Sequence, residues 1–475
     1  MREARLPLQA GVAAAVFLAG LSIILVSGMV AGLSGAAILL LVNVLVFPEL
    51  LDFVIRLYFR SVSMARRISP DPMPSVALRI PDLTPYQQRL HLKPYAMVVS
   101  VHNLGSELYS FLDGLVPHMD HLWVIDDGST DGTGDHLRAA GCRCLAGSRN
   151  QRKPGAIREL LSQLPLEIQT VVVFDPDTTF QNLSAGELSD LEQVIFEFQQ
   201  SRMAALCPCV RVRRDGLLST LQGFEYSLSL LVGRKSLADF SINSGVAIYR
   251  RTALERACRQ HSLSVYAEDL EYSLLLLGVG ERIYFDDRLV VETAGKQTWR
   301  GLFLQRVGWS FGHLKVYVDQ FANVRRVARR RLMAAYQYLL YLGLFGLLLH
   351  PLRLAAFVVI GLSFLNGVDA LLGTGMVPDA TFTNPWIFLS CYTQYLVLAG
   401  LGLAVAVPKG ERPHLLRAVP LYFFYAAFLT VPMTVGFLNW FMVRLWGRRL
   451  IGDPYQDEAS LVAELGHPLA GVRHA

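Results

Sequence analysis

The sequence predicts an α/β domain inserted between transmembrane α-helices, and three features of the 475-residue chain support this class. Hydrophobic residues make up 52% of the chain and charged residues 17%, whereas an ordinary soluble domain has about 25% charged residues. Long uncharged runs lie in both terminal parts, with a mixed, polar stretch between them. Within that stretch, short apolar segments alternate with longer amphipathic ones, as in a parallel α/β sheet. The chain is therefore predicted to fold partly in lipid.

The first hydrophobic region is predicted to anchor the chain as a helical hairpin. Residues 6–48 carry no charged side chain, which is enough for two helices of the ~20 residues that a bilayer core requires. A break at residues 32–35 (Gly-Leu-Ser-Gly) would separate the two helices. The alternative is a signal peptide, but its apolar region would extend over only ~7–15 residues. The hairpin is predicted over residues 1–60, followed by a linker over 61–92.

The second hydrophobic region, residues 332–445, is predicted to cross the membrane three or four times. Its uncharged runs lie at 332–352, 380–408 and 418–443. Each run is long enough to span a bilayer, and a further run is interrupted by Asp369. Arginines cluster before the first span, after the second and at 325–331, and the positive-inside rule places these segments in the cytosol. Residues 446–475 are predicted to be a tail, whose side depends on the number of crossings.

The central region is predicted to contain buried strands that end in paired acids. Apolar segments of strand length lie at 95–101, 121–125, 171–174 and 203–206. Asp126 and Asp127 follow the second segment, and Asp175 and Asp177 follow the third. Ligands of parallel α/β sheets bind beyond the carboxyl ends of the strands. Neighbouring carboxylates repel unless a cation is present, and their oxygens suit Mg²⁺ or Mn²⁺ completed by substrate phosphates. Ordinary turns are the alternative for each pair alone.

Two further charged positions fit chemistry at the same edge of the sheet. Glu268 and Asp269 precede an apolar run of helix length. A carboxylate there could take a proton from a hydroxyl nucleophile, and the alternative is an acid that complements the helix dipole. Lys153, in a loop with Pro and Gly, suits a phosphate or solvent. The net charge of +5 is too small to indicate nucleic-acid binding.

Taken in order, these motifs resemble the signature of membrane-bound family 2 glycosyltransferases, which include cellulose, hyaluronan and chitin-oligosaccharide synthases. The resemblance covers residues 93–320 and rests on Asp126 to Thr133, Lys153, Asp175-Pro176-Asp177, Glu268-Asp269 and Gln305 to Trp309. It implies a GT-A nucleotide-sugar-binding domain over 93–299, interfacial amphipathic helices over 300–331, and a catalytic domain on the cytosolic side of a bacterial inner membrane.

The resemblance also implies a role for each motif residue. Asp126 and Asp127 would hold the uridine and ribose of a UDP-sugar donor, and Lys153 its diphosphate. Asp175 and Asp177 would bind Mg²⁺ or Mn²⁺, with Asp177 the better ligand.

On the acceptor side, the resemblance implies that Asp269, beside Glu268, deprotonates the acceptor hydroxyl, so that transfer inverts the anomeric carbon. Gly245 and Gln305 would line the acceptor site, and the ring of Trp309 would stack on a sugar.

Two positions depart from the family pattern. Gly308 stands where the family has an arginine that contacts the diphosphate, and Arg306 is the candidate to replace it. Asn103 is followed by Leu104 where the family commonly has Asn-Glu, so a nucleotide contact there is expected to be altered.

The sequence thus predicts an inverting glycosyltransferase that extends a polysaccharide, with coupling to its export as a further expectation. Non-processive transfer to a lipid-linked acceptor, a catalytically silent nucleotide-sugar-binding relative and a transporter with a cytosolic domain are the alternatives. The predicted partners are the nucleotide-sugar donor, the acceptor and the lipid bilayer, with no nucleic acid. Export or regulatory subunits cannot be read from the sequence.

Overall fold

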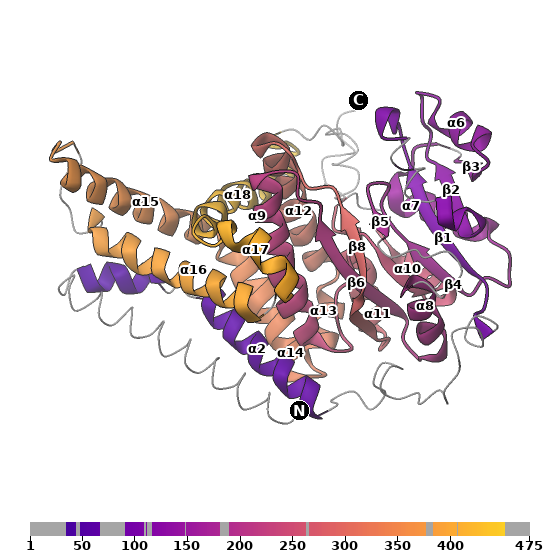
Figure 1. Cartoon of the computed structure of the whole chain (residues 1–475), viewed down its shortest axis with the longest axis horizontal. Coiled ribbons are helices and arrows are strands. Elements are labelled where there is room, and N and C mark those ends of the chain that lie inside the picture. Colours follow the sequence, from indigo (N-terminus) through magenta and orange to yellow (C-terminus); the bar gives the residue numbers. More distant parts are fainter. Residues whose placement is uncertain are drawn as a thin grey trace.

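The computed structural model describes residues 35–43, 48–66, 91–108, 111, 116–147, 149–180, 190–262, 266–376, 383–405 and 407–451. Most of the predicted linker and tail, and the first half of the predicted hairpin, lie outside these ranges. Figure 1 shows an elongated molecule with a sheet domain at one end and long helices at the other.

An eight-stranded sheet organises the domain, in the order β3-β2-β1-β4-β7-β6-β8-β5. The strands are β1 (Tyr95–Val101), β2 (Leu122–Asp126), β3 (Arg143–Ala146), β4 (Thr170–Val173), β5 (Thr179–Phe180), β6 (Ala205–Val212), β7 (Ala247–Arg250) and β8 (Ile283–Thr293). The predicted strands at 95–101, 121–125, 171–174 and 203–206 correspond to β1, β2, β4 and the start of β6. These strands could be predicted from continuous apolar runs because they are buried on both faces of the sheet.

The expectation of a parallel sheet is wrong for two strands. β7 runs antiparallel to both β4 and β6, and β5 runs antiparallel to β8. The pairing of Val173 with Ala247 places the start of β7 beside the end of β4. The loop before β7 therefore reaches the same edge as the carboxyl ends of β1, β2 and β4, which a parallel strand in this place would not allow.

Helices cover both faces of the sheet. The helices of the domain are α6 (Thr133–Ala139), α7 (Arg152–Gln163), α8 (Asp190–Gln200), α9 (Leu217–Ser227), α10 (Arg251–Gln260) and α11 (Glu268–Gly278). Apolar residues of α7, α10 and α11 pack with the face that carries Ala96 and Val98. Leu191, Ile195 and Phe198 of α8 pack with the opposite face. The two apolar layers hold the strand ends, and the loops after them, in fixed positions.

The remaining helices join the domain to the hydrophobic end of the molecule (Figure 1). They are α2 (Pro48–Arg66), α12 (Trp299–Asp319), α13 (Phe321–Ala328), α14 (Leu332–Ala335), α15 (His350–Leu372), α16 (Pro385–Val405), α17 (Arg412–Leu415) and α18 (Tyr422–Trp446), with a π-helical segment at Tyr336–Leu348. In the described ranges, α15, α16 and α18 are long and apolar enough to cross a membrane, and a shorter apolar helix covers Leu332–Leu347. The number of crossings and their orientation remain predictions.

Candidate active site

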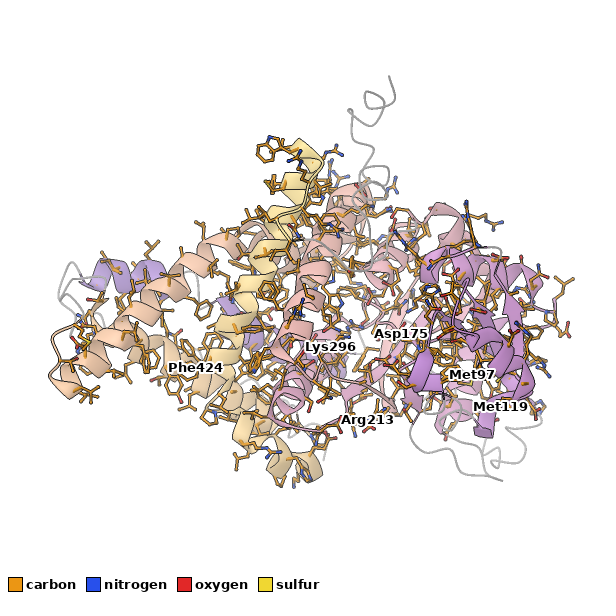
Figure 2. All side chains as sticks on the ribbon, turned by 90° about the horizontal axis from the view of Figure 1, so that it is seen from above. Met97, Met119, Asp175, Arg213, Lys296 and Phe424 are labelled. Atoms are coloured by element: carbon orange, nitrogen blue, oxygen red, sulfur yellow. The ribbon has the colours of Figure 1, made fainter. Side chains whose placement is uncertain are left out.

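The predicted acidic pairs lie at one edge of the sheet, as their positions after strands require. Val101 pairs with Asp126 in register, so the segments after β1 and β2 leave the sheet together. Val212 pairs with Thr293, which brings the ends of β6 and β8 to the same edge. Figure 2 shows Asp175 between Met97 of β1 and Met119, in the turn before β2, on one side and Phe424 of α18 on the other, along the long axis of the molecule. The candidate site therefore faces the junction between the domain and the helical end.

Lys153 is the centre of the site. It lies in the first turn of α7, so the expectation that it belongs to a loop is wrong. Its ammonium Nζ lies 2.5 Å from Asp175 Oδ1 and 3.1 Å from Glu268 Oε1, and it donates a hydrogen bond of 3.2 Å to the carbonyl oxygen of Gly245. Burial alone would lower the pKa of Lys153, but the two carboxylates raise it well above its ordinary value. The lysine is therefore cationic and bridges three segments that are far apart in the sequence.

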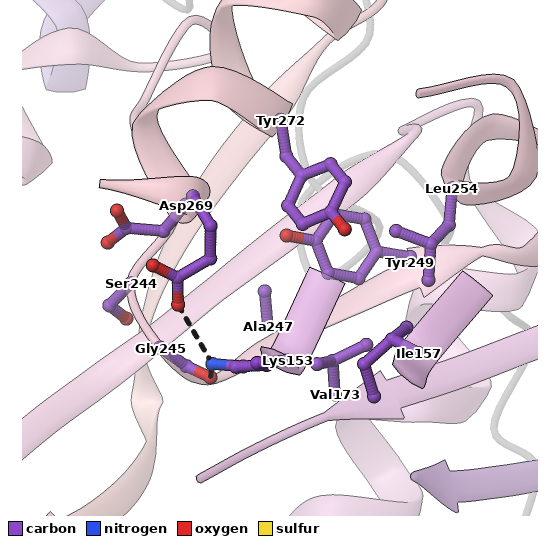
Figure 3. Close-up of a pocket in the computed structure, with 11 residues that line it drawn as sticks. Lys153, Ile157, Val173, Ser244, Gly245, Ala247, Tyr249, Leu254, Asp269 and Tyr272 are labelled. Carbon is purple, nitrogen blue, oxygen red and sulfur yellow. Dashed lines mark hydrogen bonds and ion pairs between the residues drawn. The ribbon is translucent and has the colours of Figure 1, made fainter. Parts of the chain in front are cut away.

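A pocket with an apolar floor lies beneath this cluster (Figure 3). It is lined by Lys153, Ile157, Val173, Ser244, Gly245, Ala247, Tyr249, Leu254, Glu268, Asp269 and Tyr272. Burial raises the pKa of Asp175, with help from the charge of Glu268 and against the opposing effect of Lys153. The pocket itself is narrow, but ionisable side chains with shifted pKa values and specific charge partners beside it mark a candidate functional site.

Asp177 lies beside this pocket with a different partner. Its Oδ2 accepts a hydrogen bond of 2.9 Å from the hydroxyl of Thr293, at the end of β8. The residue is exposed to solvent, but desolvation by the surrounding protein, together with the charge of Asp175, raises the pKa of Asp177. A cation bound between the two carboxylates would remove this penalty on their charged forms.

Asp269 stands at the start of α11, as predicted. Its Oδ1 accepts a hydrogen bond of 2.8 Å from the amide of Leu270. Burial raises the pKa of Asp269, and the charge of Arg234 partly opposes this effect. Ala267, the residue before the acidic pair, has a φ of +60°. Such left-handed backbone is uncommon for alanine, and it is frequent at functional sites.

The segment after β2 is fixed by hydrogen bonds from neighbouring loops. Asp127 is 2% exposed, and its Oδ1 accepts a hydrogen bond of 2.8 Å from the amide of Gln151, just before α7. Burial raises the pKa of Asp127.

Asp126 Oδ1 accepts a hydrogen bond of 3.0 Å from the amide of Ser129. Asn103 Oδ1 accepts a bond of 2.8 Å from the amide of Thr130, so its side chain links the loops after β1 and β2.

The motif from Gln305 to Trp309 lies on α12, which packs against α18. Arg306 is 6% exposed, and its guanidinium Nη2 lies 2.8 Å from Glu225 Oε2 on α9. The guanidinium carbon is 4.3 Å from the centre of the Trp309 ring. Trp309 and Gln305 are half-buried. The expectation that Arg306 contacts a diphosphate remains a prediction.

Gly308 is explained by packing against the turn that carries the acidic pair. A Cβ atom at Gly308 would lie 2.5 Å from the ring of Tyr266, and one at Gly312 would lie 2.4 Å from Tyr266 Cβ. Tyr266 precedes Ala267 and the acidic pair. The two glycines thus let this turn lie directly on α12, at a place where an arginine side chain has no room.

We expect that Gly308→Ala destabilises the protein by about 1–3 kcal/mol, because the added methyl group overpacks the Tyr266 ring. The control is Gly400→Ala in α16, where nothing lies within 4 Å of the new Cβ; it should be neutral or raise stability by up to ~1 kcal/mol. Thermal unfolding in detergent measures both. Equal unfolding temperatures for the two variants would contradict this account.

Four residues near the site were not predicted from the sequence. Thr293 binds Asp177 and Glu225 binds Arg306. Arg234 donates a hydrogen bond of 2.7 Å to the carbonyl of Ile242, near the loop of Gly245. Burial and the charges of Arg306 and Arg234 lower the pKa of His313 to about 4. None belongs to a motif, and only the sheet order and the helix packing bring them together.

The side chains present fit a divalent cation. Asp175 and Asp177 offer carboxylate oxygens, the ligands that Mg²⁺ and Mn²⁺ prefer. Desolvation is the main cause of their raised pKa values, and a bound cation would offset this cost of the charged forms. Within the ranges that the structure describes, no three His, Cys, Asp or Glu side chains are grouped to hold a metal ion alone. The remaining ligands would have to be water and a bound phosphate group.

Residues 97–257 match the family described as "Glycosyl transferase family 2". This match runs from β1 into α10 and includes Lys153, Asp175 and Gly245, but it covers less than half of the chain. The matched residues, 97–257, therefore have the class of a glycosyltransferase family 2 domain.

A solved structure, "Crystal structure of GalNAc-T7 with UDP, GalNAc and Mn2+", is similar to 54% of this chain, with 12% sequence identity and a TM-score of 0.34. The chain corresponds to 53% of that protein's chain, about half of its length. No curated protein matches the chain.

Proposed function

We propose that the protein is an inverting membrane glycosyltransferase with a GT-A domain, which transfers a sugar from a UDP-sugar to a hydroxyl of an acceptor. The observation that carries the proposal is the contact of Lys153 with both Asp175 and Glu268, beside Asp269. Lys153 and Asp175 lie inside the family 2 match, and the structure brings Glu268 and Asp269 to them from beyond its end at residue 257. Cation, acids and apolar floor together suit a nucleotide diphosphate and a nucleophilic hydroxyl.

In this proposal the loops after β1 and β2 bind the nucleoside. Asp126 and Asp127 hold the uridine and ribose, and Asn103 keeps their loop in place through Thr130. Lys153 turns from Asp175 toward the diphosphate when the donor arrives, because a phosphate competes for its protons. Asp177 and Asp175 hold the divalent cation. Such a cation supplies Lewis-acid stabilisation of the leaving diphosphate.

Asp269 acts as the general base on the acceptor hydroxyl. A raised pKa brings a carboxylate closer to the pKa that proton abstraction near neutral pH requires. Glu268 stays with Lys153 and keeps the turn in place. Attack from the face opposite the leaving diphosphate inverts the anomeric carbon. Gly245, Gln305 and Trp309 are proposed to line the acceptor site.

The acceptor is proposed to be a growing polysaccharide or a lipid-linked sugar, reached from the cytosolic face of a bacterial inner membrane. A transporter is less well supported. Asp369, the one acid within the candidate spans α15, α16 and α18, ends a helix: its Oδ1 accepts a bond of 3.0 Å from the amide of Met376 and one from the Thr374 hydroxyl. An acid used in this way is a poor member of a transport pathway.

Turnover of sugar nucleotides tests the proposal. The purified full-length protein in detergent is incubated with individual UDP-sugars and Mg²⁺ or Mn²⁺, and with oligosaccharide or lipid-linked acceptors. Release of UDP with a sugar-extended product supports the transferase, and a long-chain product identifies a processive synthase. Binding of UDP with metal, but no turnover with any acceptor, would favour a catalytically silent relative.

Removing a cation ligand should change the metal requirement. We expect Asp177→Asn to raise the Mn²⁺ concentration for half-maximal turnover at least about tenfold. Even the loss of a residue that only supports a metal ligand typically weakens metal binding by about 10–100-fold. Chelation of the cation should abolish turnover in the unmodified protein. Asp135→Asn, in an exposed ion pair with Arg138, is the control. An unchanged Mn²⁺ requirement in Asp177→Asn would remove Asp177 from the metal site.

A further inference from the structure

We propose that Glu225 is a positioning residue for the acceptor platform, by which we mean the ring of Trp309 and the guanidinium of Arg306 against it. Glu225 holds Arg306 against this ring and connects both to membrane helix α18 through Tyr425. The inference deepens the proposed function, because it assumes that Trp309 receives the acceptor. Glu225 lies outside every motif of the sequence.

One carboxylate oxygen joins three helices. Glu225 Oε2, on α9, accepts a hydrogen bond of 2.8 Å from Arg306 Nη2 on α12 and one of 2.6 Å from the Tyr425 hydroxyl on α18. The side chain of Arg306 is 7% exposed and that of Glu225 is 23% exposed. Charge-assisted hydrogen bonds of this length in a desolvated place are strong and directional. Glu225 therefore determines where the guanidinium lies.

The guanidinium in turn lies against the indole ring. Its central carbon is 4.3 Å from the centre of the Trp309 ring, within the range of a cation–π contact. The buried Nε of Arg306 has no hydrogen-bond partner in the described part of the chain. Contact with the electron-rich ring face and the bond to Glu225 thus help to keep this cation in place, together with its interaction with Tyr425. A neutral residue at 225 would leave the arginine free to turn away from the ring.

Helix α12 is also fixed to α18 one turn further on. The Ser310 hydroxyl donates a hydrogen bond of 2.7 Å to the carbonyl of Met433. A Cβ atom at Gly436 would lie 2.4 Å from the carbonyl oxygen of Val307, so the two helices are in backbone contact there. Trp309 is therefore held between two attachments to the same apolar helix, and Glu225 provides the one that touches its ring through Arg306.

A platform fixed in this way should act on acceptor binding and not on the donor. Donor binding is proposed to depend on Lys153, Asp175 and the loops after β1 and β2, for which no contact with Glu225 is found among the described residues. In this inference Arg306 serves the ring of Trp309 and not the diphosphate, so a rise of the donor KM would instead support the diphosphate contact that the family resemblance implies for Arg306. Loss of the Glu225 carboxylate should thus raise the KM for the acceptor and leave the KM for the donor and the binding of UDP unchanged. A purely structural defect would raise both KM values and weaken the binding of UDP.

The first test measures the ring itself and needs no turnover. Tryptophan fluorescence of the full-length protein is quenched with acrylamide, and the signal of Trp309 is obtained by subtraction of the matching Trp309→Phe spectrum. In Glu225→Gln, quenching of Trp309 should increase by about twofold or more, because the guanidinium no longer covers the ring. Tyr425→Phe, which keeps the ion pair, should give a smaller increase. Glu411→Gln, which removes a different carboxylate paired with Arg211 and Arg214, should leave Trp309 unchanged.

The second test is kinetic, with whichever UDP-sugar and acceptor support turnover. Glu225→Gln should raise the acceptor KM by about tenfold while the donor KM stays within about twofold. Unchanged quenching of Trp309 in both Glu225→Gln and Tyr425→Phe would overturn the positioning role, and so would equal rises of the donor and acceptor KM. If no sugar nucleotide is turned over, the proposed function fails, but the quenching result still decides whether Glu225 holds Arg306 on Trp309.

Discussion

Asp269→Asn is expected to reduce sugar transfer by about 10²–10⁴-fold, the usual contribution of a general base. The carboxamide has nearly the same shape as the carboxylate and can still accept the hydrogen bond from the Leu270 amide. It cannot accept a proton from the acceptor hydroxyl at neutral pH. The substitution leaves Lys153, Asp175 and Asp177, the residues proposed to hold the diphosphate and the cation, unchanged. Binding of UDP with Mn²⁺ should therefore remain within a few-fold of the unmodified protein.

The pH dependence of turnover gives the same prediction a second measurement. Burial raises the pKa of Asp269 above its ordinary value of 3.8, and the base must be deprotonated to act. Turnover should therefore fall as the pH drops through this raised pKa, at a higher pH than an exposed aspartate would give. Asp175 and Asp177 also have raised pKa values, but saturating Mn²⁺ should lower theirs, since a bound cation favours the charged carboxylate. The part of the acid limb that persists at saturating Mn²⁺ belongs to Asp269.

A carboxylate beyond the other end of α11 provides the control. Glu281 pairs with Arg256 at 2.6 Å, away from the pocket, so Glu281→Gln should leave turnover and its pH profile unchanged. If Asp269→Asn retains turnover within a few-fold of the unmodified protein, the base is a different residue. Loss of UDP binding in the same variant would mean that Asp269 holds the site together instead of acting on the acceptor.

The part of the site that the sequence predicts is the part built by strand ends. Asp127 and Asp175 follow continuous apolar runs, and a parallel arrangement of β1, β2 and β4 is sufficient to bring them to one edge. Lys153 and Glu268 could be placed only as candidates, because a cation in a loop and an acid at a helix start each have an ordinary structural explanation. The structure joins them to Asp175, and neither motif contains that information.

Long-range packing decides the rest, and a single sequence does not encode it in a readable pattern. The direction of β7 follows from the loop that precedes it, not from the apolar run itself, which has the same appearance in a parallel strand. Glu225 and Thr293 look like ordinary polar residues in the sequence. Only the packing of α9 on α12, and of β8 beside the loop after β4, gives them Arg306 and Asp177 as partners. Gly308 stands out in the sequence as a missing arginine, and the ring of Tyr266 explains it in the structure.

The contact between α2 and the domain depends on a buried ion pair. Arg56 and Asp52 are 4% and 7% exposed, and their side chains meet at 2.7 Å. Arg56 also donates hydrogen bonds to the Gly233 carbonyl, at 3.2 Å, and to Gln337 Oε1, at 2.6 Å. Its guanidinium carbon lies 4.4 Å from the centre of the Tyr341 ring. This one side chain thus joins α2, the segment before Arg234 and the π-helical segment.

Arg56→Met is expected to destabilise the protein by about 3–5 kcal/mol, because it leaves the Asp52 carboxylate buried without its counter-charge. The double variant Asp52→Asn/Arg56→Met should recover most of this loss, since replacing both partners of a buried pair is often close to neutral. Thermal unfolding in detergent measures the cycle, and Arg138→Met, in an exposed pair, should leave the midpoint unchanged. Equal midpoints for Arg56→Met and Arg138→Met would show that the buried pair contributes no more than an exposed one. The double variant should still turn over sugar more slowly, because Arg56 also supports the carbonyl of Gly233, next to the arginine that faces Asp269.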